Sequence, residues 1–246
     1  MYGAGRLFGA LHGFTLTGAQ FEPLSDAGLE IHAPDLPGHG DTVVDPVDPA
    51  ATVRALGTWL ASFREPVPLL GYSQGGRMAL LATLQDPMLV DRLILVSASP
   101  GIRGEERRAE RRARDEVLAR RIEAVGIDVF LDEWLTGPAT GTGHLDEAIR
   151  RRDRLVRMDN TSTGLAAALR GIGQGSQPYV GDRVGTLTVP LLTVSGHNDT
   201  QYDRLAAAMA SDAPDGIHRS IRNAGHNVLL DAPDELASVV LEFLDA

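Results

Sequence analysis

Short apolar runs alternate along this chain with segments whose apolar residues recur every three or four positions, and this rhythm constrains the fold more than any other feature. A short apolar run is typical of a buried strand, whereas the spacing of three and four is typical of a helix that covers it. Strands and helices in alternation predict a parallel sheet with helices on both faces. The candidate strands are residues 7–11, 29–33, 67–70, 93–97, 191–195 and 217–221, and the candidate crossover helices are residues 49–63, 75–84, 202–211 and 233–244.

The alternation of strand and helix patterns stops between residues 101 and 183, where the sequence becomes helical and polar, and it resumes at Val189-Pro190. We interpret this interruption as a helical cap, residues 101–183, inserted into a core that residues 1–100 and 184–246 form. A chain of 246 residues with 43% hydrophobic content is long enough for one sizeable core. Within the cap, the sequence TGPATGTG at residues 136–143 predicts a flexible loop.

The net charge of -10 argues against nucleic-acid partners and anionic membrane surfaces, because both attract basic proteins. No stretch is long and apolar enough to span a membrane, and the first residues lack the basic and then apolar pattern of a signal peptide, so we expect a cytoplasmic protein. We further expect a monomer or a homodimer. The absence of cysteine excludes disulfides, a cysteine nucleophile and thiolate metal sites. No metal-ligand spacing is present, and no predicted strand precedes the glycine-rich stretch 171–175, so we expect neither a metal nor a dinucleotide.

The most informative motif is Gly71-Tyr72-Ser73-Gln74-Gly75, which fits G-x-S-x-G between an apolar strand and a helix. In this setting a sharp turn projects the serine hydroxyl from the edge of the sheet, although a plain strand-to-helix turn can match the motif by chance. A serine becomes a nucleophile or base only when a histidine takes its proton and a carboxylate orients that histidine. The motif therefore predicts an aspartate and a histidine farther along the chain.

Asp199 and His226 meet this requirement, because each follows a predicted strand, and the order serine, aspartate, histidine is typical of the α/β-hydrolase fold. Alone, Asp199 reads as a turn or helix-capping residue and His226 as a loop histidine. Their joint order and placement favour a catalytic triad of Ser73, Asp199 and His226. His197 lies nearby but precedes the aspartate, so we interpret it as a loop residue.

The loop after the first strand carries His12-Gly13-Phe14, at the place where this fold supplies one oxyanion-hole donor. The backbone N–H groups of Phe14 and Gln74 are the two predicted donors, and His12 is expected to be structural. Residues 35–40 form a turn-rich loop to which we assign no chemistry. Arg77 lies four residues beyond Ser73, where it can either bind an anionic substrate or form a surface ion pair.

With these residues in place, the chain resembles the 2-succinyl-6-hydroxy-2,4-cyclohexadiene-1-carboxylate synthases, which are α/β-hydrolase-fold lyases of menaquinone and phylloquinone biosynthesis. The resemblance extends from Leu11 almost to the C-terminus. It is carried by the elbow GYSQGGR at residues 71–77, the arginine-rich segment 106–112, the Phe130 to Trp134 segment, the stretch ALRGIGQGSQP at residues 168–178 and the histidine loop AGHN at residues 224–227.

This resemblance implies elimination of pyruvate from a cyclohexene tricarboxylate without a cofactor. It also implies that the substrate, a small polycarboxylate, is bound by Tyr72, Arg77, Arg111, Trp134 and a third arginine, for which both Arg154 and Arg157 are candidates and Arg157 is favoured. A carboxylesterase or a C–C bond hydrolase with the same triad is the nearest alternative. A binding protein without activity is a third interpretation, which an intact triad disfavours.

Overall fold

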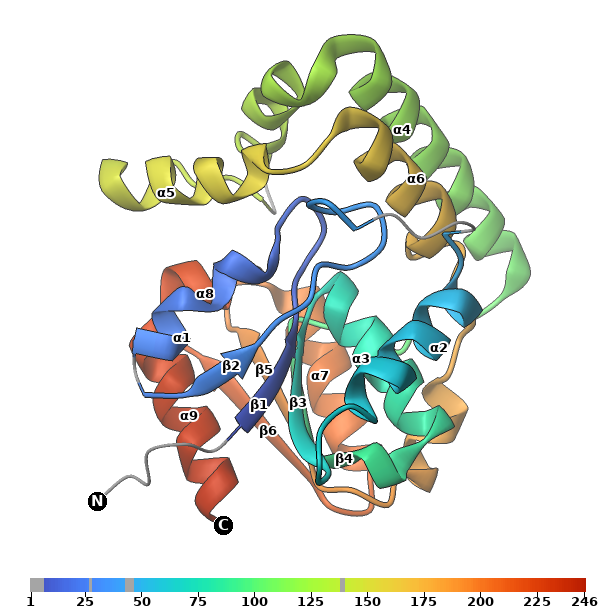
Figure 1. The fold of residues 1–246 in the computed structure, drawn as a ribbon, viewed down its shortest axis with the longest axis vertical. Helices are drawn as coiled ribbons and strands as arrows, with labels where there is room; N and C mark the ends of the chain where they lie inside the picture. Colours follow the sequence, from blue (N-terminus) through green and yellow to red (C-terminus); the bar gives the residue numbers. More distant parts are fainter. Residues whose placement is uncertain (1–6, 27, 43–46, 138–139) are drawn as a thin grey trace.

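The computed structural model describes residues 7–26, 28–42, 47–137 and 140–246. Within them one six-stranded sheet has the strand order β2-β1-β3-β4-β5-β6, and every neighbouring pair is parallel (Figure 1). The strands are β1 (Leu7–Leu11), β2 (Glu30–His32), β3 (Val67–Tyr72), β4 (Val90–Val96), β5 (Leu191–Gly196) and β6 (Gly216–Ile221). Each lies on a run that the sequence predicts as a strand, so the predicted α/β class is confirmed.

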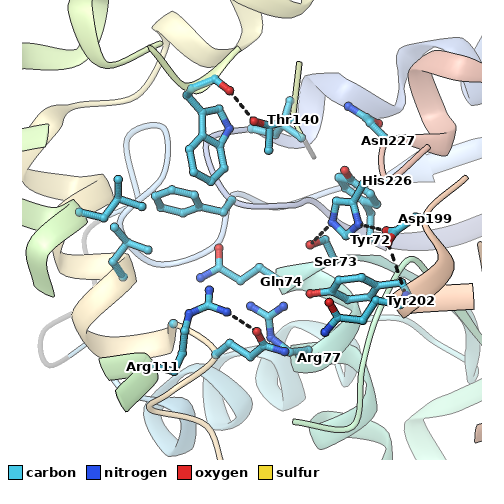
Figure 2. A pocket seen from close by; sticks show the side chains of 18 of the residues that line it. Tyr72, Ser73, Gln74, Arg77, Arg111, Thr140, Asp199, Tyr202, His226 and Asn227 are labelled. Atoms are coloured by element: carbon cyan, nitrogen blue, oxygen red, sulfur yellow. Dashed lines mark hydrogen bonds and ion pairs between the residues drawn. The ribbon is translucent and has the colours of Figure 1, made fainter. Parts of the chain in front are cut away.

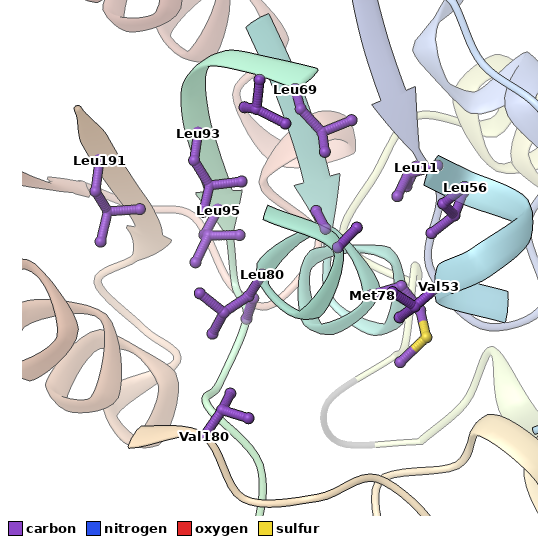
Figure 3. Packing of buried hydrophobic residues seen from close by; sticks show 14 of the residues in the cluster. Leu11, Val53, Leu56, Leu69, Met78, Leu80, Leu93, Leu95, Val180 and Leu191 are labelled. Atoms are coloured by element: carbon purple, nitrogen blue, oxygen red, sulfur yellow. The ribbon is translucent and has the colours of Figure 1, made fainter. Parts of the chain in front are cut away.

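Helices cover both faces of this sheet. The helices that flank the strands are α1 (Glu22–Asp26), α2 (Pro49–Leu60), α3 (Gln74–Gln85), α7 (Thr200–Asp212), α8 (Val228–Asp231) and α9 (Pro233–Asp245), with short 3-10 turns η1 (Gly18–Phe21), η2 (Pro87–Leu89) and η3 (Gly181–Thr186). One buried cluster joins α2, α3 and α7 to the sheet. It includes Leu56 and Met78, which are labelled in Figure 3, and Met209 of α7. A second cluster joins α1 and α9 to the opposite face, through Leu24 and Val240.

The strand order places two loops side by side. After β2 the chain crosses to the other side of β1 to form β3, so the direction in which strands are added reverses next to β1. Ligands of open α/β sheets bind at such a switch point, in the crevice at the carboxyl ends of the strands. The loops that follow β1 and β3 begin at Leu11 and Tyr72, and these are the loops predicted to carry Phe14 and Ser73.

Among the described residues between β4 and β5, three α-helices lie inside the predicted insertion, and we name them the cap: α4 (Glu105–Trp134), α5 (Glu147–Met158) and α6 (Ser162–Ile172). In Figure 1 they lie beyond the carboxyl ends of the strands. Helices α4 and α6 pack against each other around Ile122, Phe130 and Leu165. The boundaries at residues 101 and 183 stay a prediction, as does the flexibility of residues 136–143, of which residues 138–139 lie outside the described residues.

The glycines of residues 171–175 fall at the end of α6 and beyond it, so they follow a helix and not a strand. In the described part of the chain, no helix combines the length and the apolar character needed to cross a membrane.

Helix α4 is bent at Gly126, whose backbone angles are φ 81° and ψ 166°. This region of backbone conformation is open essentially to glycine alone, because a Cβ atom would collide with neighbouring backbone atoms. The bend separates the long arginine-rich part of α4 from the last turns that carry Phe130 and Trp134. Gly126 therefore sets the direction in which these two aromatic residues enter the cap.

We expect Gly126→Ala to destabilise the protein by about 1–3 kcal/mol, the usual cost of a non-glycine residue in such a conformation. Gly57 is the matched control, since it lies inside α2 and an added Cβ would meet nothing within 4 Å. Gly57→Ala should stabilise the protein by about 0.4–1 kcal/mol, because alanine reduces the entropy of the unfolded chain. Urea unfolding of both variants measures the difference, and a loss of stability of equal size in both would contradict the assigned bend.

Candidate active site

Ser73 lies in a strained turn between β3 and α3, with backbone angles φ 49° and ψ -106°. Only small residues fit beside it. A Cβ on Gly71 would lie 2.4 Å from the Cα of Gly76, and a Cβ on Gly75 would lie 2.1 Å from the Leu11 carbonyl oxygen. The turn is fixed by the hydrogen bond that Ser73 N donates to the Val96 carbonyl, at 2.9 Å. The predicted elbow is therefore present in the fold.

A relay of hydrogen bonds runs from this serine through His226 to Asp199 (Figure 2). Ser73 Oγ lies 3.0 Å from His226 Nε2, and His226 Nδ1 lies 2.5 Å from Asp199 Oδ2. With Nδ1 protonated, the carboxylate accepts that proton's hydrogen bond and leaves the Nε2 lone pair for the serine hydroxyl. His197, the nearby histidine, is exposed and lies 3.4 Å from Ser220 Oγ instead.

Two residues that the sequence analysis overlooked hold this relay in place. Asp231 Oδ2 accepts a hydrogen bond from the backbone N–H of Gly225, at 2.6 Å, directly before His226. The ring of Tyr202 lies 4.6 Å from that of His226, and the Tyr202 N–H donates to the second oxygen of Asp199, at 3.4 Å. The only sequence signal for Asp231 is an acidic residue shortly after the histidine.

The residues 12–16, which we name the oxyanion loop, follow β1 and are held by two buried histidines. His12 Nε2 accepts the N–H of Leu36 at 2.8 Å, and His39 Nε2 accepts the N–H of Thr15 at 3.3 Å. His12 is structural, as expected. The loop 35–40, to which we assigned no chemistry, supports the oxyanion loop through Leu36 and His39, which bond to His12 and Thr15. Asp35 of the same loop accepts the N–H of Gly18, two residues beyond the oxyanion loop, at 2.7 Å.

All ten residues predicted for the site line one cavity of about 300 Å³ beneath the cap. They are Phe14, Tyr72, Ser73, Gln74, Arg77, Arg111, Trp134, Arg157, Asp199 and His226. Gln74 begins α3, so its backbone N–H is one of the first-turn donors that have no acceptor inside the helix. Trp134 packs edge-on against Phe14, with 5.5 Å between the ring centroids, and so brings the cap against the oxyanion loop. The roles of these residues stay predictions.

Arg77 is buried at the base of this cavity, with 7% of its surface exposed. Its Nε donates to Gln177 Oε1 at 2.7 Å, so its closest partner is a neutral amide. Burial, with a smaller contribution from the neighbouring Arg111, lowers the pKa of Arg77 to about 10. The guanidinium is still charged at neutral pH. The surface ion pair that the sequence left open is therefore not formed at this arginine.

Arg111 reaches the same cavity from α4. Its Nε donates to Asp115 Oδ1 at 2.8 Å, and its Nη1 donates to Gln174 Oε1. Two neighbours on the helix do not line the cavity. Arg112 donates to the Gly175 carbonyl at 2.9 Å and pairs with Glu105, so it is a structural contact of the cap. Arg114 is exposed.

The two candidates for a third arginine are separated by the fold. Arg157 is buried and lines the cavity, and its Nε lies 2.8 Å from Asp153 Oδ2. Arg154 lies outside the cavity lining and pairs with Asp128 and Asp132. Tyr72 is also buried at the cavity wall, and this burial raises the pKa of its hydroxyl. Among the described residues, no cluster of three or more histidine or carboxylate side chains could hold a metal ion.

The chain is similar to known proteins of one family. Residues 10–239 match the Alpha/beta hydrolase family. A 2-succinyl-6-hydroxy-2,4-cyclohexadiene-1-carboxylate synthase of Salmonella typhimurium is 31% identical over 238 residues, which cover 94% of this chain and 92% of the relative. A Bacillus subtilis protein, provisionally given the same name, is 35% identical over 179 residues, which cover 72% of this chain and 65% of the relative.

A solved structure, that of MenH from S. aureus, superposes with a TM-score of 0.91 at 29% identity and covers 98% of this chain and 93% of that one. The likeness extends across the sheet and the cap alike, because almost the whole chain is included.

We expect the stability of the protein to fall as the pH falls from about 6.5 to about 4, because burial lowers the pKa of His12 to about 4. In that window His12 is protonated in the unfolded chain and not in the folded chain, so the unfolded state binds more protons and its free energy falls relative to the folded state. Burial and the adjacent His12 likewise lower the pKa of His39, so it acts in the same direction.

Urea unfolding at several pH values, compared between the wild type, His12→Gln and His32→Gln, measures this effect. The exposed His32 is the control, and its replacement should leave the slope unchanged. Replacement of His12 should remove up to about 3 kcal/mol of the loss. Identical slopes in all three proteins would show that His12 does not contribute.

Proposed function

We propose that the cavity is the active site of a lyase. The reason is that the chain belongs to the alpha/beta hydrolase family and, within it, to the 2-succinyl-6-hydroxy-2,4-cyclohexadiene-1-carboxylate synthases. The reaction is elimination of pyruvate from a cyclohexene tricarboxylate, which yields 2-succinyl-6-hydroxy-2,4-cyclohexadiene-1-carboxylate for menaquinone or phylloquinone biosynthesis. One observation carries this proposal. The cavity lined by the hydrogen-bonded relay of Ser73, His226 and Asp199 is also lined by two arginines, the buried Arg77 and the partly buried Arg111.

The relay supports a proton-transfer role for Ser73. His226 Nε2 takes the hydroxyl proton, and Ser73 Oγ removes a proton from a carbon of the substrate ring. The electrons of that C–H bond form a C=C bond while the C–O bond to the pyruvyl group breaks. The proton on His226 then passes to the departing pyruvate enolate through Ser73. Asp199 keeps the imidazole in the required tautomer throughout and stabilises its positive charge.

As the proton leaves the substrate, negative charge develops on a substrate oxygen, as in an enolate. The backbone N–H groups of Phe14 and Gln74 are suited to stabilise this charge. Preorganised backbone donors act strongly where water is excluded, since they need no reorientation during the reaction. The aromatic rings of Phe14, Trp134 and Tyr72 are part of the cavity lining and give it apolar surface.

The arginines favour this lyase over an esterase. Arg77 is held by a neutral amide, so its charge is not neutralised by a neighbouring carboxylate in direct contact. A protein with a net charge of -10 repels a tricarboxylate over most of its surface, and a buried guanidinium supplies local attraction. A simple neutral ester does not require such a group.

The same reasoning supports a small-molecule polycarboxylate as the binding partner and disfavours nucleic acid. We further infer that the enzyme acts in the cytoplasm without a cofactor, as a monomer or a homodimer. Activity that disappears on dialysis against a chelator and returns with a divalent ion would contradict the absence of a cofactor.

Replacement of the relay residues tests the mechanism. Ser73→Ala and His226→Ala should each lower kcat for pyruvate release by about three orders of magnitude or more, because each removes the proton acceptor. Their effects should not add in the double variant, since the two residues act as one unit. Pyruvate formation is followed in an assay coupled to the enzyme that supplies the substrate. An active single variant, or a double variant whose loss equals the product of the single losses, would refute the relay.

Replacement of the arginines tests the substrate class. Arg77→Ala and Arg111→Ala should each lower kcat/KM for pyruvate release about ten- to hundredfold, because each removes a charge-assisted hydrogen bond worth about 1.5–3 kcal/mol. Hydrolysis of a neutral aryl ester should change little. Lysine at either position should restore activity only in part, because it keeps the charge but lacks the planar guanidinium that donates two parallel hydrogen bonds to a carboxylate.

Arg114→Ala is the matched control for this comparison, because Arg114 is an exposed arginine on the same helix. Arg112→Ala is less suitable, since Arg112 contacts Gly175 within the cap. Equal losses with both substrates, or equal losses at Arg77 and Arg114, would exclude a role in binding carboxylates.

A further inference from the structure

We propose that the protein has a second small-molecule site, beside the active cavity, for a neutral compound of one ring that carries a hydroxyl group. The site is a separate cavity of about 210 Å³, which we name the second cavity, and it lies between α5 of the cap and the core elements η1, α1 and α8. The proposal goes beyond the lyase activity and does not depend on it, because it concerns binding and no reaction.

Most side chains that line the second cavity are apolar. Pro23, Ile149, Val156 and Leu229 are among them, and they come from both the core and the cap. An apolar cavity of about 150 Å³ in a protein takes up benzene. A volume of about 210 Å³ therefore accommodates one ring with a small substituent. Because Ile149 is 38% exposed, a ligand can enter past this residue.

The two ionic side chains of this lining are already paired. Arg152 forms an ion pair with Glu22. Asp153 forms a second pair with Arg157, in which Arg157 Nε lies 2.8 Å from Asp153 Oδ2. A charged ligand would therefore meet no unpaired counter-ion among the described residues of the lining. Since burial of an unpaired charge is costly, the second cavity favours a neutral ligand.

The other oxygen of Asp153 supplies a polar anchor. Asp153 is 3% exposed, and its Oδ1 is buried without a hydrogen-bond partner among the described residues. A buried acceptor left unpaired is costly, so such an atom normally bonds to protein, water or a ligand. A hydroxyl group on the ligand would donate the missing hydrogen bond to this oxygen.

Two amide side chains of the same lining, Gln20 and Asn227, also carry buried atoms without a partner in the described part of the chain. These atoms are Gln20 Nε2, a donor, and Asn227 Oδ1, an acceptor. Gln20 uses its Oε1 to accept the N–H of Gly13, at 3.3 Å. A hydroxyl group donates one hydrogen bond and accepts another, so it matches Asp153 Oδ1 and Gln20 Nε2 together. An ether only accepts, and it leaves Asp153 unpaired.

The second cavity lies behind one wall of the active cavity. The Asp153 and Arg157 ion pair is part of this wall, because Arg157 lines the active cavity and Asp153 lines the second one. Leu16 and Asn227 line both cavities. A ring in the second cavity therefore contacts the back of residues that face the substrate, without occupying the position of the substrate.

The test measures binding of 4-fluorophenol and 4-fluoroanisole to the wild type by fluorine NMR, without substrate. The two compounds share the fluorinated ring, but only the phenol donates a hydrogen bond. We expect 4-fluorophenol to bind with a Kd on the order of 1 mM, as suits so small a ligand. 4-Fluoroanisole should bind at least about tenfold more weakly, because it cannot donate to Asp153 Oδ1.

Tryptophan substitutions locate the bound ring. Ile149→Trp adds bulk in the second cavity and should weaken 4-fluorophenol binding at least about tenfold. Leu118→Trp adds the same group to the active cavity, which Leu118 lines, and should leave the affinity unchanged. Leu155→Trp is the matched control on α5, since Leu155 is 61% exposed and lines neither cavity. Thermal unfolding checks that each variant folds, and Ala19→Trp, on the core side of the second cavity, replaces Ile149→Trp if that variant does not.

Three outcomes would overturn the proposal. Failure of both compounds to bind would mean that the second cavity holds only water. Equal affinities for the phenol and the anisole would remove the role of the hydroxyl group. Binding that Leu118→Trp abolishes and Ile149→Trp preserves would place the phenol in the active cavity. A wild type that binds 4-fluorophenol as expected but releases no pyruvate would instead refute the lyase proposal and leave the second site intact.

Discussion

The strained turn at Ser73 is the constraint on which the rest of the site depends. A serine with φ 49° is unfavourable in isolation, and it persists here because the turn joins β3, bonded to β1 and β4 on its two sides, to a helix that begins at Gln74. The sheet must bring Leu11 of β1 close enough to exclude any Cβ at residue 75. The same closeness places the oxyanion loop beside the serine, so one packing requirement produces both the nucleophile and its partner donors.

The positive charge available in the cavity depends on whether each arginine contacts a carboxylate or a neutral group. Arg154 and Arg170 pair with carboxylates at exposed positions, where their charges are neutralised locally. Arg77 is instead held by the neutral Gln177, and Arg111 shares its guanidinium between Asp115 and the neutral Gln174. Amide partners orient a guanidinium without cancelling its charge, so positive potential remains in the cavity of an acidic protein. That potential favours an anionic substrate.

Local patterns explain how far the sequence predicted this structure. The strands and the order of Ser73, Asp199 and His226 could be predicted, because hydrophobic periodicity and strand-end placement are properties of short segments. The contacts of His39 with Thr15, and of Gln177 with Arg77, join residues 24 and 100 positions apart. No local pattern indicates such pairs, since each partner alone looks like an ordinary turn or cap residue. The family resemblance located Arg157 at the site, but only the fold shows its contacts with Asp153 and Thr15.

Two non-glycine residues with positive φ, Thr15 and Ser73, follow the neighbouring strands β1 and β3, and they are restrained in different ways. Ser73 is the first residue after a central strand, so the sheet itself restrains it through the Val96 carbonyl. Thr15 lies four residues beyond the end of β1, where no sheet hydrogen bond can reach it. Its restraint must come from side chains, and Arg157 and Asn160 of the cap together with His39 of the core provide it. The cap is therefore more than a cover over the cavity, because half of the proposed oxyanion hole depends on it for its geometry.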